Sequence, residues 1–465
     1  MKEVDVVIIG GGVGGYVSAI KSAQSGLKAF LIEKERIGGV CLNWGCIPTK
    51  TLVGSAELLK NIQKADEFGI QVKDYSIDFS AIMNRKEMVS RRLSSGVEQL
   101  MKANRVNIIK GNGQILKPGI IEVTPNEGEK EIVKAKNIII ATGSKSMKVP
   151  IPGIENEGVM TSNGALSLAK LPDKMIIIGG GVVGIEFACI YNAFGVDVTV
   201  IEMLPRILFS IDEEIVGKLA LTLKRKGIKV FTHCMVKKIK KNGKYLEVYI
   251  STSEREQKLE TEKVLAAMGR VPDTGNINIQ GIGIELDGKA IKVDETMRTN
   301  ISGIYAVGDV VGKVMLAHVA AREGIVAVEN ILGNRTIMDY RFIPNCVFSS
   351  PEVASVGLTE SEAREKYSNI KVSKFPYVAN GKALAMGEKE GMVKMIAQGD
   401  SNEILGVHIF GAHASDLIAE GTLSLSLEAT AEEIATTIHA HPTLTEMMAE
   451  AAEGIIGKPI HIFRR

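Results

Sequence analysis

Two stretches of the chain share one order of apolar strand, glycine-rich turn, apolar helix and second apolar strand. Residues 6–33 are VVIIGGGVGGYVSAIKSAQSGLKAFLIE and residues 175–202 are MIIIGGGVVGIEFACIYNAFGVDVTVIE; they agree at 11 of 28 positions without a gap. Short continuous apolar runs that end at glycine are typical of strands buried in a parallel sheet. The pattern therefore predicts two βαβ units, related by an offset of 169 residues.

Each unit carries the complete G-x-G-x-x-G fingerprint of dinucleotide-binding proteins. An acidic residue ends the second strand in both units, 18 residues after the third glycine, where it can accept hydrogen bonds from a ribose. An isolated fingerprint is also compatible with an ordinary glycine turn, but two copies with the acid in place favour two dinucleotide sites. The residues concerned are Gly10, Gly12, Gly15 and Glu33 in the first unit, and Gly179, Gly181, Gly184 and Glu202 in the second.

The remaining pattern predicts how the chain passes between domains. Residues 137–144 form an apolar run with a small-residue turn that ends the first unit, and residues 264–272 form a similar run that returns the chain to it. A third apolar run, residues 299–309, ends at Asp309, which could cap the next helix or contact a cofactor. From about residue 342 short strand-like and helical runs alternate without a nucleotide signature, which predicts an α+β domain.

Composition narrows the class of protein. The chain has 465 residues, of which 45% are hydrophobic and 24% charged, with a net charge of +2. These values favour a globular protein of several domains and give no reason to expect nucleic acid or a charged membrane surface. The longest apolar stretch, residues 175–191, contains the run Gly179-Gly180-Gly181 and Glu186, so it predicts strand, turn and helix rather than a membrane span. With a strand predicted directly after the first residues, we expect no targeting segment and a cytoplasmic location.

Cys41 and Cys46 lie in GGVCLNWGCIPTK, shortly after the first fingerprint. In a regular helix a five-residue step turns the two side chains away from one another, so a disulfide would require an irregular turn at residues 43–45. Alternatives are two buried structural cysteines or half of a zinc site, but no further ligands at zinc spacing lie nearby, and no metal is expected. Beside a dinucleotide site the pair favours redox chemistry. The other three cysteines, Cys189, Cys234 and Cys346, occupy apolar contexts and are predicted to be small buried side chains.

A second candidate group lies near the C-terminus, in HAHPTLTE at residues 439–446. Histidine exchanges protons near neutral pH, and a carboxylate can fix its orientation. Glu446 also has a structural interpretation, since Thr443-x-x-Glu446 is a capping box that would open a helix ended by Gly454. Both roles are possible only if the carboxylate also reaches His441.

Taken in order, GGGVGG, GGVCLNWGCIPTK, ATGS, GGGVVGIE, GRVP, AVGD, MLAH and HAHPTLTE resemble the flavoprotein pyridine nucleotide–disulfide oxidoreductases, most closely the branch that oxidises dihydrolipoamide. The resemblance covers essentially the whole chain, and Trp44 and residues 208–210 look like minor variants. It implies an α/β protein with two Rossmann-like domains, a central domain and an α+β dimerisation domain. The expected boundaries are 1–145 for FAD binding, 146–272 for NAD binding, 273–341 for a central domain completing the FAD site, and 342–465 for dimerisation.

The resemblance also implies residue roles. Cys46 would be the thiolate lying over the flavin, Cys41 the thiol that exchanges with substrate, and His441 the base, oriented by Glu446. Lys50 and Glu186 would pair near the flavin ring and link the nucleotide domains. Besides the fingerprint residues and acids, flavin contacts are expected at Lys50, Gly113, Thr142, Gly143, Ser144, Asp309, Met315, Leu316, Ala317 and His318, and NAD contacts at Val236 and Gly269.

The activity implied is oxidation of protein-bound dihydrolipoamide through a Cys41–Cys46 disulfide, with FAD passing the electrons to NAD. The expected partners are a second copy of the chain and lipoyl-bearing domains of a 2-oxo-acid dehydrogenase complex or a glycine cleavage system. Alternatives are a glutathione or mercuric reductase, or a mainly structural subunit of a multienzyme complex. The chain ends HIFRR, without the cysteine pair usual in mercuric reductases. Glu202 favours NAD over NADP, although Arg206, four residues on, could weaken this preference.

Overall fold

The computed structural model describes residues 2–252 and 255–461, so part of the C-terminal segment HIFRR lies outside the described residues. The first sheet has six strands in the order β1-β2-β3-β4-β5-β18, and β1 also pairs with β5, so that β1 lies between β2 and β5. Only β4 runs antiparallel to its neighbours. The strands are β1 Lys2–Ile9, β2 Ala29–Glu33, β3 Asn107–Lys117, β4 Ile120–Pro125, β5 Glu131–Ile140 and β18 Ile304–Ala306.

The second sheet repeats this arrangement with parallel strands in the order β10-β9-β8-β14-β7. Val6 pairs with Ala29 in the first sheet and Met175 with Val198 in the second, so the 169-residue offset holds in the strand register. The predicted βαβ repeat is therefore confirmed. The helix of the first unit is α1 (Val13–Gln24), and that of the second is α6 (Val182–Ala193). The strands of the second sheet are β7 Val159–Met160, β8 Lys174–Ile178, β9 Asp197–Ile201, β10 Lys229–Phe231 and β14 Lys263–Ala266. A separate antiparallel sheet consists of β11 Met235–Asn242, β12 Tyr245–Ser251 and β13 Glu256–Thr261.

Two short strands join the two βαβ regions: β6 (Ser144–Ser146) pairs antiparallel with β15 (Arg270–Pro272). After β15 the chain passes β16 (Leu286–Asp287) and β17 (Ala290–Ile291), and β18 then pairs with β5 of the first sheet. α8 (Ala317–Ile331) packs against α1. Residues after β15 thus return to the first sheet, as the pattern predicted, although β18 is much shorter than the apolar run that predicted it.

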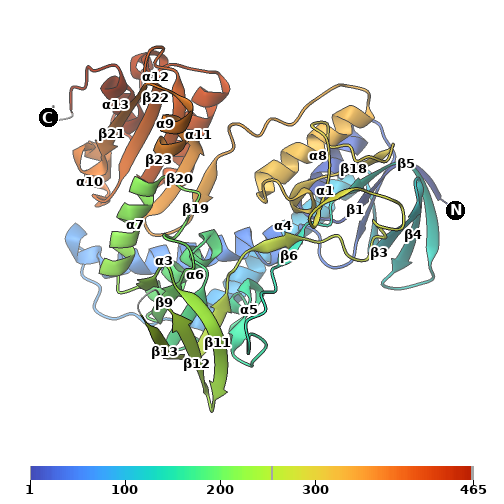
Figure 1. Cartoon of the computed structure of the whole chain (residues 1–465), viewed down its shortest axis with the longest axis horizontal. Coiled ribbons are helices and arrows are strands. Elements are labelled where there is room, and N and C mark those ends of the chain that lie inside the picture. The colour runs from blue at the N-terminus through green and yellow to red at the C-terminus, as the bar shows by residue number, and fades with distance from the viewer. Residues whose placement is uncertain (1, 253–254, 462–465) are drawn as a thin grey trace.

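The C-terminal region is an antiparallel five-stranded sheet with helices, in the order β19-β20-β23-β22-β21. It forms the orange-to-red body of Figure 1, beside the green second βαβ region. The α+β prediction is confirmed, but the sequence pattern did not single out β20 or β21. The elements are β19 Asn345–Val347, β20 Glu352–Gly357, α9 Glu360–Lys366, β21 Ile370–Pro376, α10 Gly381–Ala385, β22 Met392–Gln398, β23 Ile404–Gly411, α11 Ala414–Ser426, α12 Ala431–Thr436 and α13 Glu446–Ile455.

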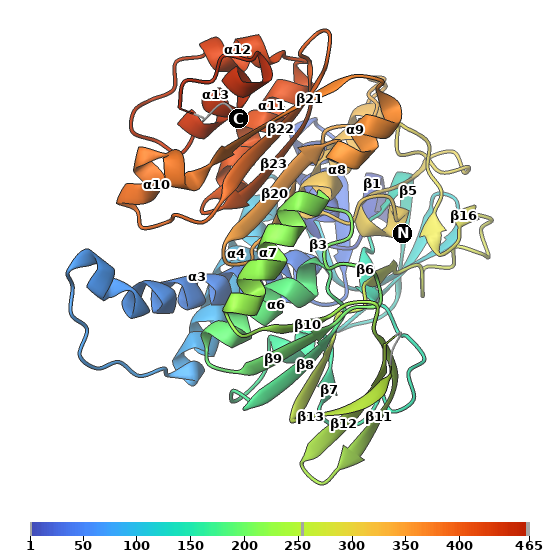
Figure 2. The same ribbon diagram turned by 60° about the vertical axis from the view of Figure 1, so that its left-hand side comes forward.

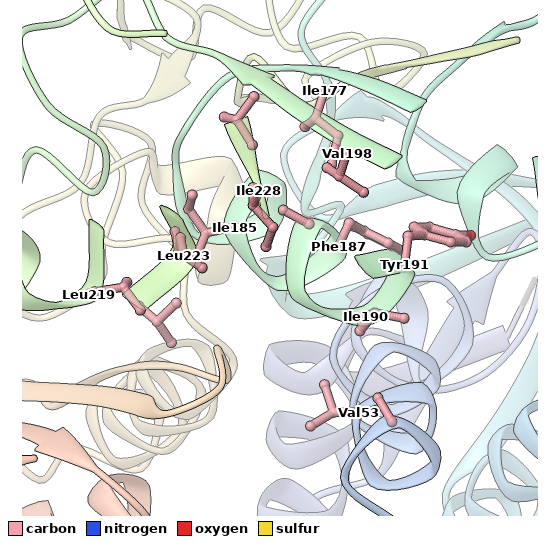
Figure 3. Close-up of a cluster of buried hydrophobic side chains, with 14 of the residues drawn as sticks. Val53, Ile177, Ile185, Phe187, Ile190, Tyr191, Val198, Leu219, Leu223 and Ile228 are labelled. Carbon is pink, nitrogen blue, oxygen red and sulfur yellow. The ribbon is translucent and has the colours of Figure 1, made fainter. Parts of the chain in front are cut away.

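The helix that begins at Cys46 packs against the second βαβ unit. This helix, α3 (Cys46–Gln63), and α4 (Phe79–Ala103) extend beneath the C-terminal body, as Figure 2 shows. Figure 3 shows Val53 of α3 beneath Ile190 of α6, within a cluster that also contains Leu219 and Leu223 of α7 (Glu213–Arg225). Burying an aliphatic side chain contributes about 1.5–3 kcal/mol. These contacts fix the start of α3 relative to the second unit as well as the first.

In the two ranges of described residues, no helix is both long enough and apolar enough to cross a membrane.

Candidate active site

Backbone conformation and close packing within the chain require glycine at the first and third positions of each fingerprint. Gly10 and Gly179 have φ of +108° and +109°, in the region that side chains rarely adopt. A Cβ at Gly15 would lie 1.8 Å from the Gly10 oxygen, and one at Gly184 would lie 2.0 Å from the Gly179 oxygen. Helix and strand could not approach so closely with any other residue.

At the middle position of each fingerprint, neither the backbone conformation nor packing within the chain requires glycine. Gly12 (φ −68°, ψ −175°) and Gly181 (φ −75°, ψ −176°) have backbone conformations open to any residue. A Cβ at Gly181 would meet nothing within 4 Å, and one at Gly12 would meet only the Gly39 Cα, at 4.0 Å. Each glycine directly precedes a helix, whose free N–H groups and dipole attract anions. The space that a Cβ would fill at each helix N-terminus fits the diphosphate of a dinucleotide.

The two strand-end acids hold the glycine turns in the same way. Glu33 Oε2 accepts from the Gly11 N–H at 2.6 Å, and Glu202 Oε2 accepts from the Gly180 N–H at 2.6 Å. Their Oε1 atoms accept from the N–H groups of Glu35 and Leu204, each at 2.7 Å. A carboxylate oxygen has two lone pairs, so each acid can still accept from a ribose hydroxyl.

The cysteine pair lies where one helix ends and the next begins. α2 (Gly39–Asn43) stops before Trp44, and α3 starts at Cys46, so the predicted irregular turn is present. Both thiols are free and hydrogen-bonded to one another. A Cβ on Gly39, at the start of α2, would lie 2.7 Å from the Gly12 Cα. The segment carrying the thiols therefore lies directly against the first dinucleotide turn.

The two thiols differ in acidity. The hydrogen bond from the Cys41 thiol lowers the pKa of Cys46 to about 7 against the opposing effect of burial, and Lys50 acts in the same direction as the hydrogen bond. The same bond, together with burial, raises the pKa of Cys41. Cys46 is thus the thiol of the pair that ionises near neutral pH, and a thiolate is the reactive form.

We expect alkylation of the reduced protein by iodoacetamide to occur first at Cys46, with a rate that rises with pH through a midpoint near 7. Removing the donor with Cys41→Ala should move this midpoint upward. Mass spectrometry of the modified peptide across a pH series measures both. First modification at Cys41, or a Cys46 midpoint unchanged by Cys41→Ala, would contradict the assignment.

Lys50 and Glu186 form the pair expected from the sequence. Lys50 Nζ lies 2.8 Å from both carboxylate oxygens of Glu186, and Glu186 is only 4% exposed. The Phe348 N–H donates to Glu186 Oε1 at 3.0 Å, and its ring lies 4.4 Å from Lys50 Nζ. The pair thus joins α3, α6 and the segment after β19. Sequence reasoning did not identify Phe348, because a backbone N–H donor leaves no residue-type signal.

Asp309 does not cap a helix, so that interpretation is wrong. It lies inside a short 3-10 helix, Gly308–Val311, and its carboxylate accepts a hydrogen bond from the Ser144 hydroxyl. Arg270 donates to Ser144 Oγ and to Ser144 O, both at 2.7 Å. Sequence reasoning did not assign Arg270, although it quoted it in the GRVP motif that places it beside ATGS. Thr142 Oγ1 also bonds across this link, to the Asp273 carbonyl at 2.7 Å.

The remaining expected cofactor residues lie within strands or beside the ends of strands and helices. Gly113 is buried in β3 against Ile32, and Gly269 follows β14 with φ of +103°. Val236 is only 7% exposed, in the core of the second unit. Residues 315–318 lead into α8, with His318 Nε2 3.0 Å from the Pro344 carbonyl oxygen.

Glu446 contacts both groups that its two sequence interpretations require. Oε1 lies 2.9 Å from His441 Nδ1, and Oε2 accepts from the Thr443 N–H at 2.8 Å. The prediction of a full capping box is wrong. α13 starts at Glu446 after an N-cap at Thr445, and the Thr443 hydroxyl donates to the Ala440 carbonyl at 2.7 Å instead of capping the helix. The helix also continues past Gly454 to Ile455. The His441 side chain is 80% exposed.

Two dinucleotide turns, a dithiol against the first, and a carboxylate–imidazole pair define a disulfide oxidoreductase that uses two nucleotides. The family model described as pyridine nucleotide-disulphide oxidoreductase matches residues 4–324, and the dimerisation domain of the same family matches residues 343–452. The chain belongs to the pyridine nucleotide-disulphide oxidoreductase family. Its fold is therefore that of a two-nucleotide flavoprotein with a C-terminal dimerisation domain, as expected from the sequence.

Known relatives share nearly the whole chain. It is 43% identical to the dihydrolipoyl dehydrogenase of Bacillus subtilis over 99% of both chains. It is 40% identical to the mitochondrial dihydrolipoyl dehydrogenase of Pisum sativum over 99% of this chain and 93% of that one. Among solved structures, LpdA of Mycobacterium tuberculosis superimposes with a TM-score of 0.91 at 27% identity, covering 98% and 100% of the two chains. The HOCl-induced flavoprotein disulfide reductase RclA of Escherichia coli, as its Cu(II) complex, gives 0.89 at 28%, covering 97% and 99%.

Proposed function

We propose that this chain oxidises protein-bound dihydrolipoamide and reduces NAD, using FAD and the Cys41–Cys46 pair. The observation that carries the proposal is the dithiol segment held against the first dinucleotide turn, with Gly39 in contact with Gly12. The full-length similarity to dihydrolipoyl dehydrogenases supports this substrate over glutathione disulfide or mercuric ion. We also propose that the domain boundaries predicted from sequence apply, and that the cellular location is cytoplasmic.

In the proposed reaction, one substrate thiol gives its proton to His441 and attacks the Cys41 sulfur of the Cys41–Cys46 disulfide. The disulfide bond breaks and Cys46 leaves as thiolate. His441 releases the first proton to solvent, then takes the proton of the second substrate thiol and passes it to Cys41, which that thiol displaces to form lipoamide. Bound FAD would carry the two electrons of the dithiol to NAD, giving NADH. Lys50, beside Cys46, favours the thiolate, and the Glu446 carboxylate holds His441 Nδ1 so that Nε2 can accept the proton.

The second copy of the chain would complete each site. His441 is 80% exposed in one chain. Ile438, three residues before it, is 97% exposed, and Leu423 and Leu427 on and after α11 are 60% and 71% exposed. Large apolar side chains at such exposure are expected to be covered by a partner. The match to the family's dimerisation domain supports a homodimer, and lipoyl-bearing domains of a multienzyme complex are the proposed further partners.

The decisive assay compares two reactions of the purified flavoprotein: dihydrolipoamide with NAD, and glutathione disulfide with NADPH. We expect turnover of the first pair and only background for the second. Efficient reduction of glutathione disulfide with little oxidation of dihydrolipoamide would contradict the proposal.

We further expect kcat/KM for NAD to exceed that for NADP by about 100-fold or more, since a phosphate beside the Glu202 carboxylate is repelled without a compensating contact, a cost of roughly 3 kcal/mol for an unpaired buried charge. Steady-state kinetics with saturating dihydrolipoamide measure the ratio. Comparable values for the two nucleotides would show that Glu202 does not contact the ribose.

A further inference from the structure

A short loop connects the Glu202 carboxylate to the glycine turn of the second unit. We call residues 203–209 the second strap. Its Leu204 N–H donates to Glu202 Oε1 at 2.7 Å, and its Leu208 N–H donates to the Gly180 carbonyl at 2.9 Å. Arg206 lies midway along the chain between these two anchors.

The first unit contains the equivalent strap, which serves as an internal comparison. There the Gly38 N–H donates to the Gly11 carbonyl at 2.8 Å, which is the counterpart of the bond between Leu208 and Gly180. The loop between the acid and this bond is one residue longer in the second unit. Counted from this shared bond, Arg206 corresponds to Arg36 and Phe209 to Gly39. Arg36 Nη1 lies 3.2 Å from the Glu87 carboxylate, so the first strap's arginine has a counterion.

Arg206 has no such counterion. Among the described residues no carboxylate lies within ion-pair distance of it; instead its guanidinium lies 4.5 Å from the Phe209 ring, and Nη2 donates to the Phe209 carbonyl at 2.9 Å. Its Nε is buried without a hydrogen-bond partner. A guanidinium without a counterion gains from any anion that reaches its exposed nitrogens. The 2′-phosphate of NADP would be such an anion.

We propose that Phe209 is a specificity-determining residue of the second nucleotide site: it holds Arg206 on its ring and so keeps that cation from neutralising a 2′-phosphate beside Glu202. Glu202 repels the phosphate, and Phe209 withholds the group that would offset the repulsion. The inference rests on the proposed function only in taking this site as the one for NAD. An exposed cation–π contact contributes about 0.5–1 kcal/mol, which converts to roughly a two- to fivefold change in affinity.

The test measures binding by calorimetry on the FAD-containing protein, with two probes that cannot accept electrons: ADP-ribose and 2′-phospho-ADP-ribose. In Phe209→Ala we expect affinity for 2′-phospho-ADP-ribose to rise about two- to fivefold, with a smaller change for ADP-ribose. Phe209→Tyr keeps an aromatic face and is the matched control, so it should bind as the unsubstituted protein does. In Phe209→Ala/Arg206→Ala the gain should disappear, because the released cation is gone.

Three outcomes would overturn the role of Phe209: no rise in Phe209→Ala, an equal rise for both probes, or a rise that persists without Arg206. Failure of the proposed function is separately visible. If the unsubstituted protein did not bind ADP-ribose at all, the second unit would not be the NAD site, and both proposals would fall. Normal ADP-ribose binding without a selective gain removes only the proposal about Phe209.

Discussion

Cys46→Ser should retain bound FAD and lose dihydrolipoamide oxidation to the level of the assay without enzyme. Disulfide exchange requires two sulfurs, and a serine oxygen forms no disulfide bond under these conditions. Cys41→Ser should give the same loss, since the hydrogen-bonded pair acts as one unit. The loss should lie in kcat, measured as NADH formation at saturating substrate, with the flavin spectrum reporting cofactor content.

The matched control is Cys189→Ser, because Cys189 lies in α6 and is not part of the hydrogen-bonded pair. It should keep both the flavin and the activity. Appreciable turnover by either Cys41→Ser or Cys46→Ser would refute the assignment of the redox pair. Loss of FAD together with activity would point to a folding defect, so the flavin content must be established before the kinetics are interpreted.

Mixing inactive Cys41→Ser and His441→Gln subunits should restore activity, up to about half the wild-type value per heterodimer. A general base must come within about 2.6–3.2 Å of its proton donor, directly or through one water. If His441 acts on the partner's thiols, a heterodimer has one site with both defects and one site with none. Exposure of His441 and of Ile438 in one chain supports this arrangement.

Differently tagged subunits, purified through both tags in sequence, isolate the heterodimer from the parent homodimers. Each homodimer alone gives the baseline. Heterodimers that form and remain inactive would mean that each site is built from a single chain. Glu446→Gln is a useful companion variant: it keeps the shape but weakens the hold on His441 Nδ1, and it should reduce kcat less than His441→Gln does.

Local sequence predicted the repeated units because their determinants are local. The positive φ of Gly10 and the contact between Gly15 and the Gly10 carbonyl depend on residues only a few positions apart. The irregular turn between Cys41 and Cys46 could be inferred for the same reason. Pairings such as Lys50 with Glu186 came from the family resemblance, since no local pattern relates residues that far apart in the chain.

Contacts between common residue types that are far apart along the chain could not be predicted from the sequence. Asp309 follows a strand and precedes a helix, which fits an N-cap, but its carboxylate is engaged by Ser144, on a strand from another part of the chain. Thr443 and Glu446 have capping-box spacing, but the Thr443 hydroxyl bonds elsewhere. In both cases the side chain forms a hydrogen bond other than the helix-capping bond that its local sequence predicts.

The double anchoring by Glu202 ties nucleotide preference to the integrity of the turn. Its two oxygens accept hydrogen bonds from the N–H groups of Gly180 and Leu204, so this carboxylate stabilises the turn as well as being the proposed acceptor for the ribose. Replacing it to admit NADP would also release two backbone donors, each costing about 1–3 kcal/mol if left unsatisfied. A protein engineer who changes only this position should therefore expect a weakened binding site for both nucleotides rather than an exchange of one for the other.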